Sequence, residues 1–404
     1  MSENIILNYA KKNYKEMFRE ADGYLKYKFI VPGSVYSNTL WDWDSWLTNI
    51  ALRQLVQEDI GEYEKGCVLN FLEAVDEKGR VPIHMKANFS MEEFANRGES
   101  NIHKPCLAQH AAFIIKNNKG DAEWVRPHFS KLCRLAEYYM QNCRHKTGLY
   151  FWINDVAIGV DNDPATFYRP NKSSASIFLN CLMYRELEAL CYIGELLEEN
   201  ISVYKEEAEH LKEAVRTHCY DEKDGMYYSA DLNLLPIDPE AQLHSGAPRH
   251  WDCLIQRLGC WSGFLAMWSG IATEEQAERM VRENLLDEKA FWAPYGVRTL
   301  SKYEKMYSIK KTGNPSCWLG PIWGISNYMV FRGLVKYGYE KEARELAEKT
   351  VRMFESDIIE SGELHEYYNP EDGKPIMNPG FQNWNLLSIN MRAWLKGEEV
   401  VEEF

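Results

Sequence analysis

The segment ARELAEKTVRMF, residues 343–354, shows a pattern that recurs through most of the chain. The residues expected to be buried, such as Ala343, Leu346, Ala347 and Thr350, follow the i, i+3, i+4, i+7 spacing of one helix face. A second clear case spans 173–199, where a run of serines can cap the first turn. Ten further stretches carry similar spacing, near 5–20, 44–57, 61–76, 105–118, 124–142, 202–219, 256–269, 274–285, 321–337 and 383–396. The sequence therefore predicts about twelve helices.

Few segments show the strict alternation expected of strands. The exceptions, 148–152 and 225–228, are short and indicate small hairpins in loops. No Pro/Ser-rich linker or shift in composition divides the helical stretches. The predicted fold class is therefore all-α, with six helical hairpins closed into an (α/α)6 barrel and a single domain over 1–404; a pair of helical domains is the alternative.

The connections between the predicted helices are uneven in length. The long ones lie near 77–104, 143–172, 220–255, 286–320 and 357–382. Long loops without helices of their own are usually functional. If the helices alternate inward and outward, these loops fall on one rim, and we expect that rim to be the active face.

Composition excludes several classes of partner. The net charge is −14, and no basic stretch could neutralise nucleic-acid phosphates or bind an anionic membrane. No apolar run approaches the roughly 18 residues that span a bilayer, and the first residues do not form a secretory signal. Ten cysteines are present and none forms Cys-x-x-Cys, so we expect reduced thiols, a cytoplasmic protein, and neither metal nor cofactor. The chain is expected to act as a monomer or a homo-oligomer.

Aromatic residues collect in the loop-like segments, where packing alone would not place them. Tryptophan faces offer a flat apolar surface to a sugar ring, and neighbouring carboxylate or amide groups can bond its hydroxyls. This reasoning selects a set of candidate substrate-binding residues: Tyr36, Trp41, Trp43, Asp44, Gln109, Asn162, Tyr295, Trp318, Trp323 and Trp384.

Two acidic segments lie far apart in the chain, at 159–164 and 365–373. Asp161 of the first and Glu366 of the second are separated by 366 − 161 = 205 residues. Two carboxylates brought by loops to one aromatic cavity are what acid-catalysed glycoside hydrolysis requires. Each segment taken alone is also typical of a turn, and Asp163 is an alternative to Asp161 as the acid.

Four motifs resemble those of a known group of enzymes. They are Trp-x-Trp-Asp-Ser at 41–45, Gly-x-Asp-Asn-x-Pro at 159–164, Trp-x-Gly-Pro-Ile-Trp at 318–323 and Glu-x-Tyr-Asn-Pro-x-x-Gly at 366–373. The chain thereby resembles the trehalase-like (α/α)6 glycosidases of glycoside hydrolase families 37 and 63. Among these it is most similar to the compact members that include mannosylglycerate and glucosylglycerate hydrolases.

The resemblance implies hydrolysis of a small α-linked glycoside with inversion at the anomeric carbon. It implies Asp161 as general acid and Glu366 as general base. Basic residues on the rim could bind an anionic aglycone such as glycerate, although surface ion pairs are the more common use of such residues; they are Arg169, Arg249, His250 and Arg298. Two rivals stay open: a sugar epimerase or isomerase on the same barrel, and a catalytically altered sugar-binding protein.

Overall fold

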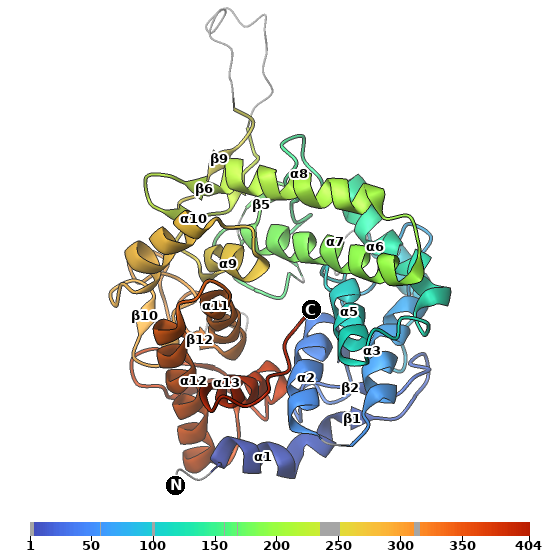
Figure 1. Ribbon diagram of the computed structural model, residues 1–404, viewed down its shortest axis with the longest axis horizontal. Coiled ribbons are helices and arrows are strands. Elements are labelled where there is room, and N and C mark those ends of the chain that lie inside the picture. The colour runs from blue at the N-terminus through green and yellow to red at the C-terminus, as the bar shows by residue number, and fades with distance from the viewer. Residues whose placement is uncertain are drawn as a thin grey trace, which may run out of the picture.

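Helices arranged in two concentric layers form the scaffold of the computed structural model (Figure 1). The inner layer consists of α2 (Asp42–Leu55), α5 (Leu107–Asn117), α7 (Ile177–Leu197), α9 (Leu265–Ser269), α11 (Gly324–Lys336) and α13 (Ser388–Leu395). The outer layer consists of α1 (Ile5–Asn13), α3 (Gly61–Glu73), α6 (Phe129–Asn142), α8 (Ser202–Cys219), α10 (Glu274–Arg279) and α12 (Glu340–Ser361). The structure describes residues 4–56, 58–98, 102–156, 158–167, 169–234, 251–310 and 316–404.

The inner layer is a closed ring. Each inner helix contacts the next along the chain, from α2 to α5, α7, α9, α11 and α13, and α13 packs back against α2. The expected (α/α)6 barrel is therefore confirmed, and each stretch predicted to be helical contains a helix of the inner or the outer layer.

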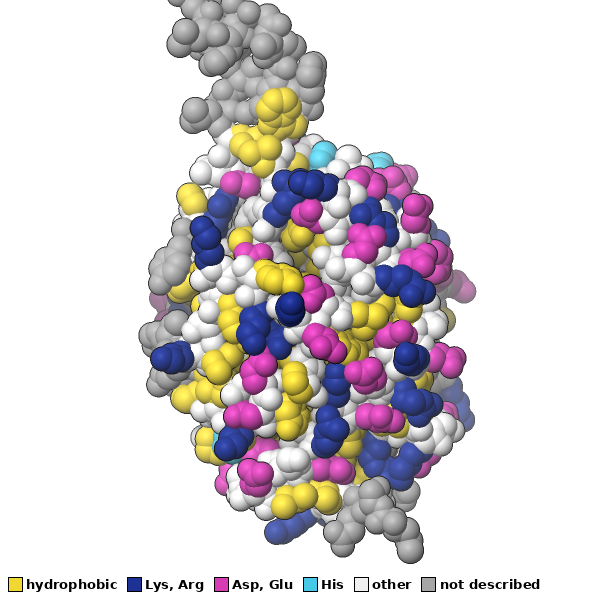
Figure 2. Space-filling model, turned by 90° about the vertical axis from the view of Figure 1, so that its left-hand side faces the viewer, with side chains coloured by type: hydrophobic (Ala, Val, Ile, Leu, Met, Phe, Trp, Pro, Cys, Tyr) yellow, Lys and Arg dark blue, Asp and Glu magenta, His cyan; other side chains and the backbone are white. Residues whose placement is uncertain are grey.

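Burial explains which helix occupies which layer. The inner α7 buries 15 of its 21 residues, whereas the outer α12 buries only 7 of its 22. A helix that is apolar nearly all round must be covered on every side, while one with a single apolar stripe can face water. Figure 2 shows the side of the molecule on which β10 lies: Lys and Arg side chains alternate there with Asp and Glu, without a continuous basic surface.

Short helices complete the chain at the ends of the longer ones. They are η1 (Tyr14–Met17), α4 (Met91–Asn96), η2 (Arg126–His128), η3 (Trp261–Phe264), η4 (Met280–Leu285, a π-helix) and η5 (Asn383–Leu387). The helix α4 lies inside 77–104, which was expected to be loop; the side chain of Ser90 caps it by accepting from the backbone N–H of Glu93. Among the described residues, none of the helices is long and apolar enough to cross a membrane.

The strands are short and pair in small sheets between the helices. They are β1 (Phe18–Arg19), β2 (Phe29–Ile30), β3 (Leu40–Trp41), β4 (His84–Met85), β5 (Ser174–Ala175), β6 (Tyr220–Asp221), β7 (Met226–Tyr227), β8 (Ala230–Asp231), β9 (Leu254–Ile255), β10 (Trp292–Ala293), β11 (Gly296–Val297), β12 (Ile322–Trp323), β13 (His365–Tyr368) and β14 (Pro375–Pro379). The hairpin expected at 225–228 is the β6–β7 pair. At 148–152 the structure has a single bridge between Tyr150 and Arg144.

One sheet matters for the site because it carries Glu366. The strand β13 pairs with β12 on one side and with β14 on the other, both antiparallel. Glu366 was expected on a loop and instead lies on a strand held from both sides. The strands β12 and β13 lie about 40 positions apart in the chain, so their pairing has no local signature.

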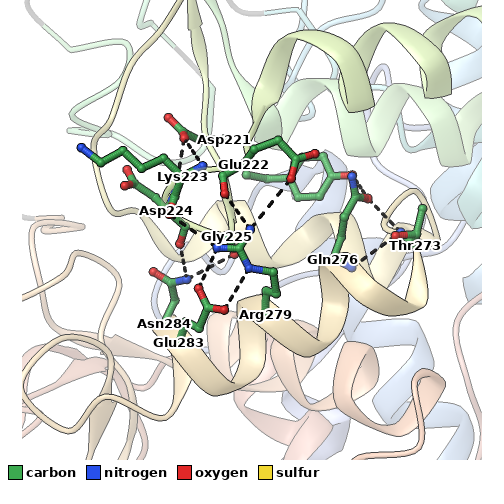
Figure 3. A network of polar contacts seen from close by, with 11 residues as sticks. Asp221, Glu222, Lys223, Asp224, Gly225, Thr273, Gln276, Arg279, Glu283 and Asn284 are labelled. Carbon is green, nitrogen blue, oxygen red and sulfur yellow. Dashed lines mark hydrogen bonds and ion pairs between the residues drawn. The ribbon is translucent and has the colours of Figure 1, made fainter.

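Polar contacts fasten the turn between β6 and β7 to the outer helix α10. Figure 3 shows Arg279 of α10 donating hydrogen bonds to the carbonyls of Glu222 and Lys223, in the turn between β6 and β7. Arg279 also pairs with Glu283 one turn further along. Thr273 begins α10 with a capping box that it shares with Gln276. The loop is thereby fixed to the scaffold at a point outside the ring.

The chain returns to the centre of the ring at its C-terminal end (Figure 1). There the buried carboxylate of Glu403 accepts hydrogen bonds from Trp268 Nε1, Tyr328 Oη and Arg332 Nε at 3.2, 2.7 and 3.0 Å. A buried charge needs both a counter-ion and donors for its remaining lone pairs, and Glu403 has both. The segment thus ties α9 to α11 inside the barrel.

Candidate active site

A cavity of about 270 Å³ lies where several loops meet the inner helices. Its walls come from the start of α2, from β4, from the loop 158–164, and from β12, β13 and η5. The lining residues are Tyr36, Trp41, Trp43, Asp44, Ile83, His84, Lys104, Gly159, Asp161, Ser316, Trp323, Glu366, Phe381 and Trp384.

Most of the residues selected from the sequence lie together on these walls. The two candidate catalytic carboxylates face the same cavity although they are 205 residues apart in the chain (366 − 161). The selected residues in the lining are Tyr36, Trp41, Trp43, Asp44, Asp161, Trp323, Glu366 and Trp384. The site therefore combines three carboxylates with four tryptophans.

Two further selected residues, Asn162 and Trp318, stand directly behind the wall. The Trp318 ring stacks on Trp323, with centroids 3.9 Å apart and planes at 11°. The backbone N–H of Trp318 donates to Asn162 Oδ1 at 2.6 Å. Asn162 therefore fastens the loop of Asp161 to the segment that supports Trp323, so both residues shape the cavity without lining it.

Gln109 and Tyr295 do not reach the cavity, which corrects the expectation for both. The Gln109 amide donates to the carbonyls of Pro105 and Leu182 at 2.8 and 3.0 Å, so its N–H groups serve the α5–α7 contact. Tyr295 packs beside Gly373, with the Arg352 guanidinium 5.7 Å from its ring centroid. Both side chains hold the scaffold together.

Asp44 is buried on the floor of the site. Its Oδ1 accepts a hydrogen bond from Asn383 Nδ2 at 2.5 Å. The pKa of Asp44 is raised to about 7, mainly by burial and also by the charge of Asp42, while Lys104 and the Asn383 hydrogen bond oppose the shift. Asn383 is one polar partner of this carboxylate, and a sugar hydroxyl in the cavity can supply another.

Glu366 is 7% exposed and accepts a hydrogen bond at Oε2 from the Asn378 amide of β14. Burial raises the pKa of Glu366 to about 7, and the charge of Asp161 also raises it, whereas the Asn378 hydrogen bond lowers it. Asp161 is half-buried. The pKa of Tyr36 is raised by burial and then by the charges of Glu366, Asp44 and Asp161, so all three carboxylates act on one hydroxyl.

Asp163 lies away from the cavity walls. Its Oδ2 accepts a hydrogen bond from Thr166 Oγ1 at 3.0 Å within the same loop. Burial raises its pKa to about 6. Of the two aspartates considered as the acid, only Asp161 faces the cavity.

Lys104 is the main lining residue that the sequence did not reveal. Its Nζ lies 2.9 Å from both carboxylate oxygens of Asp42 and 5.0 Å from the Trp43 ring centroid. Gly159 packs directly against it, since a Cβ there would lie 2.9 Å from Lys104 Cε. This ion pair joins residues 62 positions apart, so only the folded chain shows it.

His84 also lines the cavity, although its sequence context indicated a structural role. Its ring lies 4.5 Å from that of Trp41, and burial lowers its pKa. The remaining lining residues that were not selected are Ile83, Gly159, Ser316 and Phe381. They are small or apolar residue types, which carry no chemical signal in a sequence.

The arginines considered for an anionic aglycone are occupied by other partners. Arg169 pairs with Asp231, and Arg298 pairs with Glu371 at 2.8 Å. The expected preference for ion pairing therefore holds for these two. Arg249 and His250 lie outside the described residues.

One cluster among the described residues has the composition of a metal site: Asp42, His103 and Cys106, all buried. Lys104 already occupies both oxygens of Asp42 at 2.9 Å. A cation placed there would face this ammonium group directly, so the cluster does not fit a metal ion.

Comparison with known proteins identifies the class. An (α/α)6 barrel with two carboxylates in an aromatic cavity is the arrangement of a glycoside hydrolase. Residues 36–385 match the family described as the mannosylglycerate hydrolase MGH1-like glycoside hydrolase domain, so the chain belongs to that family.

Several proteins resemble the chain over different lengths. Mannosylglycerate hydrolase MGH1 of Selaginella moellendorffii is 25% identical over 88% of this chain and 80% of its own length. A probable mannosyl-oligosaccharide glucosidase of Schizosaccharomyces pombe is 25% identical, and the match covers 72% of this chain but only 34% of that relative.

Solved structures show the same fold. The mannosylglycerate hydrolase of Thermus thermophilus in complex with glucose superposes with a TM-score of 0.70 at 18% identity, over 94% of this chain and 99% of that one. Neutral trehalase of Saccharomyces cerevisiae gives a TM-score of 0.64 at 16% identity, over 92% and 75%.

Proposed function

We propose that this glycoside hydrolase cleaves a small α-linked glucoside or mannoside, such as a glycosylglycerate, with inversion of the anomeric carbon. The observation that carries the proposal is the meeting of Asp161 and Glu366 on one tryptophan-lined cavity. The names of the relatives supply the glycerate aglycone as a candidate. At about 270 Å³ the cavity lies at the small end of ligand pockets, which suits a small glycoside.

In the proposed mechanism, the non-reducing sugar rests against the tryptophan faces while Asp44 bonds its hydroxyls. Asp161 donates a proton to the glycosidic oxygen. Glu366, ionised, takes a proton from a water molecule that attacks the opposite face of the sugar. The glycosidic carbon–oxygen bond breaks, the leaving group departs as an alcohol, and the sugar is released with the inverted anomer. Every group in these steps belongs to the protein, the substrate or water.

The test is a panel of α-linked glucosides, mannosides, galactosides and their glycerates, followed by proton NMR of the first-formed anomer. We expect hydrolysis of at least one α-glycoside to the β-anomer. Asp161→Asn and Glu366→Gln should each lower kcat by about 10²–10⁴-fold, the usual contribution of a general acid or base. A retained anomer contradicts the inverting mechanism.

The same panel separates the two rivals. An epimerase would convert free sugars without splitting a glycoside. A sugar-binding protein would bind members of the panel equally well with and without Asp161 and Glu366, and would hydrolyse none of them.

We further propose that residues 1–404 act as one catalytic domain, which the closed ring supports.

All ten cysteines are free thiols in the structure, which supports a reducing compartment such as the cytoplasm.

A further inference from the structure

His365, the residue directly before Glu366, is held at three polar groups. Its backbone N–H donates to Tyr368 Oη at 2.8 Å. Its carbonyl accepts from Asn385 Nδ2 at 2.7 Å. Its ring Nδ1 lies 2.9 Å from Asp357 Oδ2. The residue is therefore fixed at both backbone groups and at the side chain together.

Asp357 is the centre of these contacts. It lies in the last turns of the outer helix α12 and is 2% exposed. Its Oδ2 accepts from Tyr368 Oη at 2.7 Å as well as facing His365, and its Oδ1 accepts from Ser361 Oγ at 2.9 Å. Tyr9 of α1 also lies within electrostatic reach of Asp357. A buried carboxylate is costly unless it is bonded, and here the bonds run to the strand of Glu366.

The position of these contacts links the outer helix to the reacting groups. Glu366 follows His365 in β13, and its side chain reaches the cavity while Asn378 holds Oε2 from β14. A base that must aim a water molecule at one carbon loses about 100-fold in rate when displaced by roughly 1 Å. The pairings with β12 and β14 hold β13 in its sheet, whereas the contacts of His365 hold the first residue of the strand in place.

We propose that Asp357 and His365 are positioning residues that set the direction of the Glu366 carboxylate from the outer ring of the barrel. The inference rests on the proposed role of Glu366 as general base. Neither residue lines the cavity, so both act through the backbone of β13.

The decisive experiment compares His365→Leu with His365→Asn on a glycoside that the wild-type protein hydrolyses. The side-chain amide of Asn can donate from the place of Nδ1, whereas Leu cannot. His365→Leu should lower kcat about tenfold or more with KM within about twofold of the wild type. His365→Asn should recover kcat to within about threefold. Asp357→Ala should lose about as much kcat as His365→Leu.

Ser361→Ala is the matched control. Ser361 bonds Asp357 at Oδ1 and the backbone of Glu363, whereas His365 lies at Oδ2, so this variant leaves the His365 contact in place and should keep kcat and KM near the wild-type values. If His365→Leu keeps its kcat, the inference fails while the proposed function stands. Equal losses in the Leu and Asn variants, in step with a lower unfolding temperature, show a merely structural role and also overturn it.

A wild-type protein that hydrolyses no glycoside defeats the proposed function but still leaves the positioning testable. Amide hydrogen exchange over 365–368 should then rise about tenfold in His365→Leu and stay near wild type in His365→Asn. Equal exchange in the two variants overturns the inference by itself.

Discussion

Asn383 donates from Nδ2 to Asp44 Oδ1 at 2.5 Å and accepts through its own Oδ1 from Thr48 Oγ1 at 2.9 Å. All three side chains are buried. The two ends of an amide differ, so the Thr48 hydroxyl decides which end of Asn383 faces the carboxylate. Asn383 also has φ of 28°, a conformation that tightly packed surroundings must maintain. Asp44 is therefore oriented by Asn383, which is itself oriented by Thr48 of the same helix as Asp44.

Thr48→Val keeps the shape of the side chain and removes the donor. The Asn383 amide is then free to turn its oxygen toward Asp44, which would repel the carboxylate. An unpaired buried polar group costs about 1–3 kcal/mol, so we expect KM to rise roughly tenfold with a smaller change in kcat. Steady-state kinetics on the hydrolysed glycoside measure both. The control is Thr350→Val, a buried threonine that bonds Asn327 at 2.9 Å away from the cavity and should leave KM unchanged.

The second prediction concerns pH. Glu366 must be ionised to act as the base, and its pKa is raised to about 7, mainly by burial. The value of kcat/KM should therefore rise with pH through about 7. This rising limb of the pH profile reports the pKa of the base in the free enzyme. Asn378→Gly removes the hydrogen bond that lowers this pKa, so the limb should move to higher pH by about half a unit to one unit.

Glycine suits this position because Asn378 has φ of 54°. Lys119→Gly, at φ of 58° on the surface, controls for the change of backbone alone and should leave the profile in place. A limb that stays fixed in Asn378→Gly, or one that moves to lower pH, would show that Glu366 is not the group being titrated.

The barrel could be predicted from the sequence because helix periodicity is local. The spacing of apolar residues in α7 or α12 depends on neighbours within two turns, and burial of one face follows directly. The tryptophans and carboxylates of the site were found for a similar reason, because the residue type alone indicates which chemistry each side chain can perform. Trp43, Asp44 and Glu366 are examples.

What the sequence could not supply was pairing between distant segments. Lys104 is a buried cation only because Asp42, 62 residues away, neutralises it. Gln109 looked like a sugar ligand until α7 brought the Leu182 carbonyl to its amide. The strand of Glu366 exists because β12 and β14 flank it. In each case the deciding partner is set by tertiary packing, which no local pattern encodes.

The last prediction separates the two aspartates of the loop 158–164. Asp161 faces the cavity, whereas Asp163 bonds Thr166 and does not line the cavity. Asp161→Asn should lower kcat by about 10²–10⁴-fold. Asp163→Asn should keep kcat within about threefold, because an amide oxygen can still accept from Thr166.

Asp163→Asn, which should leave kcat nearly unchanged, should instead change how the stability of the protein depends on pH. Burial raises the pKa of Asp163 from 3.8 to about 6, so the folded state binds its proton more tightly than the unfolded state does. The contribution of Asp163 to the free energy of unfolding should therefore fall as pH rises from about 4 to about 6, by an amount on the order of 3 kcal/mol. Asp163→Asn removes this contribution, so stability should fall less between about pH 4 and about pH 6 in the variant than in the wild type, which denaturant titrations at roughly one-unit steps of pH would measure. Loss of activity in Asp163→Asn with activity kept in Asp161→Asn would instead make Asp163 the acid and require the loop to rearrange when substrate binds.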